Sequence, residues 1–298
     1  MRKIRLRQSV LAWCCVLFAA PVLSGNATAF AAAAPMADKM SSEEVIAKHL
    51  ESIGTEAARA EARSRVVVGT SRATFKARNS SGAIDGRVVL ASDNNKVLFG
   101  MGFDAPNYPG EKFGFDGKKY TVGYLTPGIR STLGNFLLPY GNIFKEGLVG
   151  GTLSSAWTLL NLAERKPRLE YGGTEKLGDL SVHRVKYFPN KGSDLQISLF
   201  FDAKNFQHVR TQYEQIIGAR LGAGGADSSA RQVETRVKMI EEFSDYKREG
   251  KLNLPHSYKL QLEINKQSVA SVDKWEMSLS QFAFNQSIDE KSFNVEAN

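Results

Sequence analysis

The sequence predicts a mainly β protein of the α+β class, in which one antiparallel sheet has an apolar face covered by helices. Two observations carry this prediction. Apolar and polar residues alternate over residues 233–243 and 258–265, whereas apolar residues recur at helical spacing over residues 129–160. Alternation places one kind of side chain on each face of a strand. Sheets with one apolar and one polar face are normally antiparallel.

The chain begins with a predicted export signal. Four basic residues precede an apolar run over residues 10–23 that is too short to span a bilayer, and a small-x-small pattern follows at residues 27–29. We therefore expect a signal peptide over residues 1–29, with an uncleaved anchor as the alternative, and one exported domain over residues 30–298. Cys14 and Cys15 are the two cysteines and both lie in the signal. The exported domain is then expected to have no disulfide and no thiolate site.

The charge of the chain gives little support to a nucleic-acid partner. The formal net charge is +8, from 39 basic and 31 acidic residues. Without the four cations of the signal, 35 basic residues remain, a surplus of four that is spread along the sequence. Nucleic-acid binding normally shows a clustered basic patch. A weak attraction to anionic lipid headgroups is compatible with this charge.

Two helices are predicted at the start of the exported domain. Ser41 and Glu44 have the spacing of a capping box, the apolar residues that follow share one helix face, and Gly54 is a natural stop. Thr55 begins a second short helix that extends to residue 62. His49 lies on the apolar face of the first helix and is interpreted as a packed core residue.

Residues 65–123 are predicted to form a meander of antiparallel strands. Residues 92–95 have turn composition, and Asp116-Gly117 is a favoured two-residue hairpin turn. The expected strands cover residues 66–68, 73–77, 86–91, 96–101, 112–115 and 118–123.

A helical insertion interrupts the strands over residues 129–160. Pro139 and Gly141 break the helical spacing, and Thr152 is a candidate cap for the second part. The insertion is interpreted as one or two kinked helices that complete the core on the apolar face of the sheet. The alternative is a movable plug over a cavity, with hinges in the glycines at positions 147, 150 and 151.

Strands resume after the insertion and alternate well. The central hairpin has its turn-and-restart segment at residues 245–256, where Gly250 is suited to positive φ and Pro255 to an extended entry. A glycine-rich loop is expected at residues 218–230. In the last strand the apolar phase changes at Ser280, which predicts a β-bulge. The other expected strands cover residues 168–171, 181–188, 195–201 and 208–214, with the last strand from residue 275.

No pattern in the sequence indicates catalysis, a cofactor or a metal. The four histidines lack a partner at metal-ligand spacing, and no Gly-x-Ser-x-Gly elbow supports a catalytic triad. His183 is interpreted as a packed strand residue, His208 as solvent-facing and His256 as part of a turn. Glu241 and Glu242 are neighbours in a strand and face opposite sides, so they cannot act as an acid/base pair. The chain is expected not to be an enzyme.

The segments that end the chain resemble the outer-membrane lipoprotein-sorting (LolA-like) family. Residues 243–246 precede Gly250 and the Leu-Pro-His of residues 254–256, and residues 284–289 precede Phe293. The capped first helix, the meander and the helical insertion fit the same resemblance, which covers most of the exported domain. It implies a strongly curved, unclosed antiparallel half-barrel with the inserted helices on its concave face. It also implies a periplasmic carrier that shelters acyl chains of lipids or lipoproteins.

The resemblance places the ligand between the insertion and the apolar strands. An acyl chain gains about 0.8 kcal/mol per buried methylene, so a modest apolar cavity can hold one. The expected partners are acyl chains, an inner-membrane donor and an outer-membrane acceptor, and the protein is expected to be a monomer. An envelope interaction protein with a filled core and, after it, a hydrolase using the same cleft are the alternatives. The expected lining consists of Phe136, Leu137, Tyr140, Phe144, Leu148, Trp157, Leu160, Val237, Met239, Leu260, Leu262, Trp275 and Met277.

Overall fold

The computed structural model describes residues 40–77, 80–217, 235–266 and 269–295. The predicted signal peptide and the predicted loop at residues 218–230 lie outside these ranges. Within the described ranges, no helix combines the length and the apolar character needed to cross a bilayer. The domain boundary at residue 30 stays a prediction.

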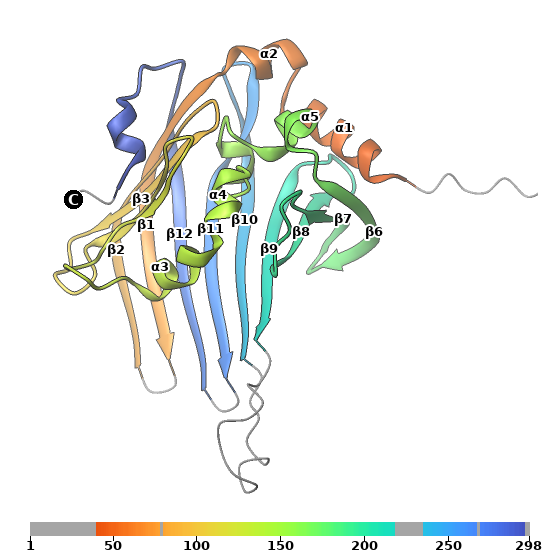
Figure 1. Cartoon of the computed structure of the whole chain (residues 1–298). Coiled ribbons are helices and arrows are strands. Elements are labelled where there is room, and N and C mark those ends of the chain that lie inside the picture. Colours follow the sequence, from red (N-terminus) through yellow and green to blue (C-terminus); the bar gives the residue numbers. More distant parts are fainter. Residues whose placement is uncertain (1–39, 78–79, 218–234, 267–268, 296–298) are drawn as a thin grey trace, which may run out of the picture. The chain divides into compact units, whose positions relative to one another are not determined.

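One antiparallel sheet of twelve strands organises the described residues (Figure 1). The strand order is β5-β4-β3-β2-β1-β12-β11-β10-β9-β8-β7-β6. Neighbours in the sheet are mostly hairpin partners in the chain, and β1 lies beside β12. The sheet begins at β5 and ends at β6, so it is unclosed, and the predicted mainly β, antiparallel fold class is confirmed. The strands are β1 Ser64–Ala77, β2 Ser80–Asp93, β3 Lys96–Phe103, β4 Gly110–Phe115, β5 Tyr120–Val122, β6 Arg168–Leu177, β7 Leu180–Phe188, β8 Gln196–Asp202, β9 His208–Ile217, β10 Thr235–Glu249, β11 Leu252–Lys266 and β12 Val269–Phe284.

The two predicted N-terminal helices are present with the predicted caps. Helix α1 spans Ser42–Ile53, and the Ser41 hydroxyl accepts a hydrogen bond from the Glu44 amide. Helix α2 spans Glu56–Glu61, and Thr55 caps it through the Ala58 amide. Side-chain caps satisfy amides that have no partner inside the helix, which explains why both helices begin where the sequence indicates.

The predicted insertion is broken into short segments instead of one or two kinked helices. These are α3 Thr132–Leu137, η1 Leu138–Tyr140, α4 Gly141–Lys145, η2 Gly151–Leu153, η3 Thr158–Asn161 and α5 Leu162–Arg165. Gly147, Gly150 and Gly151 have φ values of 69°, 79° and 48°. A helix cannot continue through such left-handed residues, and Thr152 lies inside η2 instead of capping a helix. We call residues 131–165 the cover.

The central hairpin is longer than predicted. Its strands β10 and β11 continue up to a two-residue turn at Gly250 and Lys251, where Gly250 has the predicted positive φ of 59°. Pro255 and His256 therefore lie within β11, and the assignment of His256 to a turn was wrong. The long strands persist because the ladder continues on both sides of Asp245, from Ser244 opposite Ser257 to Tyr246 opposite Pro255.

Other details of the strands confirm or correct the predictions. The bulge at Ser280 is confirmed, because Val68 faces Gln281 while Gly69 faces Leu279. Strand β6 continues through residues 172–173 with a change of register, where a strand end was predicted. The β4–β5 turn comprises the four residues 116–119, since Phe115 pairs with Tyr120.

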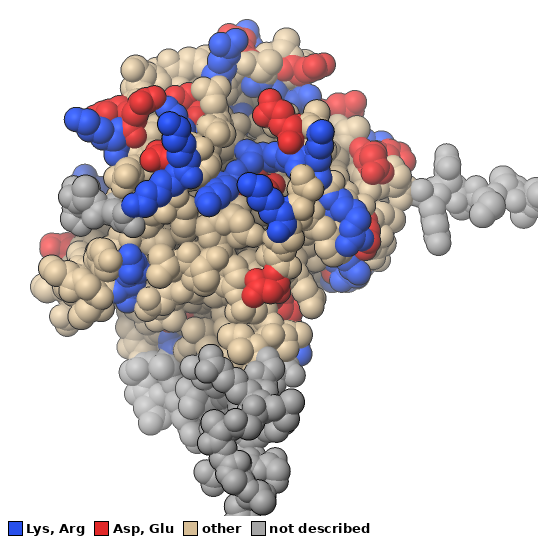
Figure 2. Space-filling model, viewed as in Figure 1, with Lys and Arg blue, Asp and Glu red and all other residues tan. Residues whose placement is uncertain are grey.

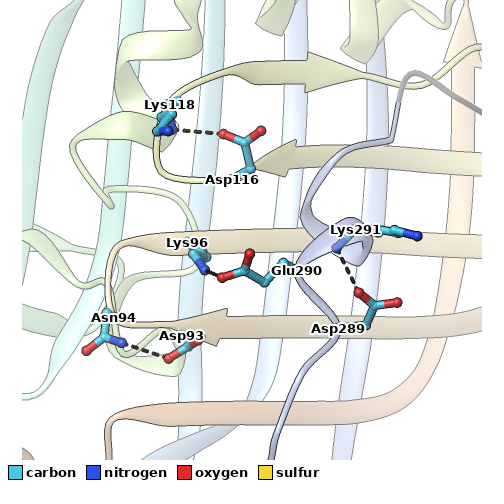
Figure 3. Close-up of polar contacts among 8 residues, drawn as sticks. All are labelled: Asp93, Asn94, Lys96, Asp116, Lys118, Asp289, Glu290 and Lys291. Atoms are coloured by element: carbon cyan, nitrogen blue, oxygen red, sulfur yellow. Dashed lines mark hydrogen bonds and ion pairs between the residues drawn. The ribbon is translucent and has the colours of Figure 1, made fainter.

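The C-terminal segment packs against the sheet beside β3 and β4 (Figure 3). Its short helix η5 spans Glu290–Phe293, and Glu290 forms an ion pair with Lys96 of β3. Phe293 is fully buried, and the Val295 amide donates to the Thr121 hydroxyl at 3.0 Å. Gly114 permits this contact, since a Cβ there would lie 2.2 Å from the Phe293 carbonyl oxygen.

Candidate functional site

The candidate site is the apolar face of the sheet together with the cover that lies on it. Figure 1 shows α3 and α4 crossing one face of the sheet in front of its long central strands. The Ser131 hydroxyl caps α3 by accepting from the Gly134 amide at 2.7 Å. Because the cover consists of segments of three to six residues, it has few internal helical hydrogen bonds and depends on contacts with the sheet.

Twelve of the thirteen predicted lining residues lie together in one hydrophobic core. Leu160 is the exception, since it is half-buried at the border of that core. The cover and the sheet meet through rings, with the Phe144 centroid 4.8 Å from that of Tyr120 and 5.7 Å from that of Phe113. The predicted residues are thus brought together in space. Whether they line a bound ligand stays a prediction.

A buried carboxylate fastens the middle of the cover to the sheet. Glu241 of β10 is fully buried, and its Oε1 accepts from the Gly150 amide at 2.7 Å and from the Tyr258 hydroxyl at 2.6 Å. Its Oε2 accepts from the Tyr213 hydroxyl at 2.7 Å. Burial raises the pKa of Glu241 to about 6, although these hydrogen bonds favour the charged form and oppose the shift.

A second buried carboxylate fastens the start of the cover. Glu111 of β4 accepts from the Ser131 hydroxyl at 2.7 Å and from the Tyr108 hydroxyl at 2.6 Å. The indole of Trp275 in turn donates to the Tyr108 oxygen at 2.9 Å. Burial raises the pKa of Glu111 to about 7. The residue that caps α3 is therefore bonded to the sheet through a carboxylate.

A buried arginine holds the cover next to its glycine pair. The Arg65 guanidinium donates from Nη1 to the Thr152 carbonyl at 2.6 Å, and its Nε and Nη2 have no hydrogen-bond partner among the described residues. Burial lowers the pKa of Arg65 to about 10. The Thr152 hydroxyl lies 3.4 Å from the hydroxyl of Tyr246 in β10.

A histidine pair surrounds the Trp157 ring. The Trp157 indole donates to His49 Nε2 at 3.2 Å, so His49 Nδ1 carries the proton and donates to the Phe206 carbonyl at 3.0 Å. His208 stacks on Trp157 with centroids 4.8 Å apart. Both imidazoles are fully buried, and burial lowers the pKa of His49 to about 4. The prediction that His208 faces solvent was wrong, whereas the packed His49 and His183 are confirmed.

Glu241, Glu111 and Arg65 were not predicted as site residues, but their places in the alternating pattern are a signal that the sequence contains. Glu241 has the strand parity of Met239 and Phe243, and Glu111 has that of Phe113, so both are charged residues on an apolar face. Arg65 stands in the same relation to Val67. Each of the three binds the main chain or the cap of the cover, so together they fasten the cover to the sheet. Among the residues in view, no three His, Cys, Asp or Glu side chains are grouped to hold a metal ion.

Comparisons with known proteins find similarity in structure only. No family model and no curated protein matches the sequence. A putative outer membrane lipoprotein-sorting protein domain from Vibrio parahaemolyticus is 13% identical, with 85% of this chain and 97% of that chain covered and a TM-score of 0.44. A LolA superfamily protein from Nitrosomonas europaea is 11% identical, with coverages of 86% and 98% and a TM-score of 0.43. A DUF1329 family protein from Desulfovibrio piger is 8% identical, with coverages of 85% and 96% and a TM-score of 0.36. The first two belong to the family that the sequence resembles.

Proposed function

We propose that the protein is a periplasmic carrier or binder of acyl chains of lipids or lipoproteins, and that the chain binds between the cover and the sheet. The observation that supports this most is the way the apolar face is closed. A continuous apolar surface is covered by short segments that contain three left-handed glycines, and buried polar side chains fasten these segments at separate points. Such a cover can separate from the sheet without unfolding the strands.

The cost of releasing the cover and the gain from burying an acyl chain are of comparable size. Each hydrogen bond to a charged group contributes about 1.5–3 kcal/mol, so release of Glu241, Glu111 and Arg65 from the cover costs roughly 5–9 kcal/mol. An acyl chain of about fourteen methylenes gains about 11 kcal/mol on leaving water. A bound chain can therefore offset the loss of these three hydrogen bonds, provided that the apolar side of the cover contacts the chain instead of water.

The compartment and the partners belong to the same proposal. The predicted export signal at the start of the sequence supports a periplasmic location. In that compartment the cargo would come from an inner-membrane donor and pass to an outer-membrane acceptor, with the protein acting as a monomer. No covalent chemistry is needed for this role, because uptake and release require only the reversible opening of the cover.

Uptake of a fluorescent fatty acyl probe tests the proposal. We expect the purified wild-type protein to bind the probe and to release lipid into organic solvent for mass spectrometry. Phe144→Glu should abolish uptake, because this ring of the cover is fully buried against β4 and β5 and a carboxylate there would oppose an apolar guest. Phe144→Met is the matched variant and should retain uptake, since methionine adapts to irregular apolar contacts. Circular dichroism verifies that both variants fold. Equal uptake by folded Phe144→Glu would overturn the assignment of the lining.

One observation favours a different function. The twelve buried lining residues already pack against one another, as they would in an interaction protein with a permanently filled core. That protein would be recovered without lipid and would not take up the acyl probe. Failure of the folded wild-type protein in both assays would therefore replace the carrier proposal with this one.

A further inference from the structure

A large polar hollow lies outside the apolar core. It has a volume of about 930 Å³, at the upper end of the range typical of small-molecule sites. Four separate parts of the chain form its walls: the α1–α2 segment, the β2–β3 turn, the cover from Glu146 to Arg165 and the loop between β7 and β8. The hollow is therefore a product of the complete fold and is formed by no single loop.

Cationic side chains outnumber carboxylates in this hollow by four to three. It is lined by Arg59, Arg63, Arg165 and Lys191, against the carboxylates of Glu56, Glu146 and Glu164. Two of these carboxylates already accept a hydrogen bond from a neighbouring side chain. The Tyr187 hydroxyl donates to Glu146 at 2.8 Å, and the Asn161 amide donates to Glu164 at 2.5 Å. Figure 2 shows Lys and Arg side chains gathered on the same face where α4 and α5 lie.

Two of the guanidinium groups are held in place by the main chain. Arg165 donates from Nη1 to the Lys145 carbonyl at 2.5 Å and from Nη2 to the Ala156 carbonyl at 3.5 Å. Its Nε is buried and has no partner among the described atoms. Arg59 donates to the Leu50 carbonyl at 2.7 Å. Groups fixed in this way lose little freedom on binding, and a buried donor without a partner favours an incoming acceptor.

We infer that this hollow binds a phosphate group. Phosphate oxygens accept the parallel N–H bonds that a planar guanidinium offers, and a lysine adds a point charge. Arg63 and Lys191 are exposed at the rim, and their side chains make no hydrogen bond or ion pair within the described chain, so the two charged groups are free to close on such a ligand.

The floor of the hollow connects it to the proposed acyl site. Ala156, Trp157 and Leu160 form part of its wall, and the buried Trp157 is also part of the hydrophobic core. A lipid with a phosphate in its headgroup could therefore place the head in the hollow and its tails beneath the cover. This assignment to a lipid headgroup rests on the proposed function, whereas phosphate binding itself does not.

Three probes separate these ideas in titrations with the purified protein. Glycerol 3-phosphate carries the phosphate without tails, dihexanoylglycerol the tails without phosphate, and dihexanoyl phosphatidylglycerol both. We expect Arg63→Glu combined with Lys191→Glu to weaken glycerol 3-phosphate binding by about tenfold or more. The matched control combines Arg87→Glu with Lys186→Glu, which makes the same change of charge at two exposed strand positions outside the hollow. The control should bind as wild type does.

Each outcome has a definite meaning. Absence of glycerol 3-phosphate binding by wild type, or an equal loss in the control, would overturn the phosphate site. Phosphatidylglycerol binding that exceeds glycerol 3-phosphate binding and weakens in the rim variant supports a lipid headgroup. Equal binding of the two supports a free phosphate ester. If glycerol 3-phosphate binds but neither lipid does, the phosphate site stands and the acyl-carrier proposal fails.

Discussion

At the scale of single residues, the buried charges explain how the cover is held. Glu241, Glu111 and Arg65 lie on the apolar side of their strands, and each is bonded to the cover. Hydrogen bonds satisfy the buried carboxylates of Glu241 and Glu111, whereas Arg65 keeps two nitrogens without a partner among the described residues. Loss of the partners of a buried charge is costly. The same three residues that break the apolar pattern of the sheet therefore help to attach the cover, together with hydrogen bonds that involve Ser92, Tyr187 and His49.

The pH dependence of stability tests the role of Glu241. Burial raises its pKa from the ordinary 4.5 to about 6, so the folded protein binds this proton more tightly than the unfolded chain does. The contribution of Glu241 to stability therefore grows as the pH falls from above 6 to 4.5. Relative to Glu241→Gln, wild type should gain about 2 kcal/mol over this range in urea unfolding.

The buried histidines change stability with pH in the opposite direction. The informative quantity is therefore the difference in unfolding free energy between wild type and Glu241→Gln. Burial lowers the pKa of His49 and His208, so their contribution to stability is lost as the pH falls below their ordinary 6.5. Both proteins contain these histidines, and their effect cancels in the comparison. A difference in unfolding free energy that does not vary with pH would contradict the assignment to Glu241.

At the scale of elements, the strands and caps could be predicted from the sequence, but the form of the cover could not. Alternation, Ser41 and the phase change at Ser280 depend on neighbouring residues, and the structure confirms each of them. The breaks in the cover depend on tertiary contacts. Gly147, for example, has left-handed geometry and lies against the Ala156 carbonyl, and no local pattern reveals that approach.

Gly147→Ala should loosen the cover. An added Cβ would lie 1.8 Å from the Ala156 carbonyl oxygen, and the φ of 69° is unfavourable for alanine. We expect limited proteolysis within residues 131–165 to accelerate and stability to fall by about 3 kcal/mol or more. Gly128→Ala is the matched control, since φ is 80° there but nothing lies within 4 Å of the added atom. That variant should cost about 1 kcal/mol. Equal proteolysis of the two variants would show that the contact with Ala156 does not hold the cover.

At the scale of the whole molecule, the sheet and the cover have different origins of stability. The first strand, β1, pairs with the last, β12, which ties distant parts of the chain together, and the central strands β10, β11 and β12 are each 15 or 16 residues long. The cover adds packing and a few fastenings. The burial of the candidate lining residues could be predicted from apolar periodicity, because such residues face the core in any case. His208 and the polar hollow could not, since both arise where segments distant in sequence meet.

The central claim is that the cover moves to admit an acyl chain. Its most direct test is a measurement of the distance between the cover and the sheet. Pulsed electron paramagnetic resonance would report this distance between spin labels at Lys145 of α4 and Lys274 of β12. Cys14 and Cys15 are replaced by serine in the labelled protein. Binding of an acyl lipid should lengthen the distance, while a pair at Arg87 and Lys274 within the sheet should stay unchanged. Lipid uptake with an unaltered distance between Lys145 and Lys274 would contradict the account.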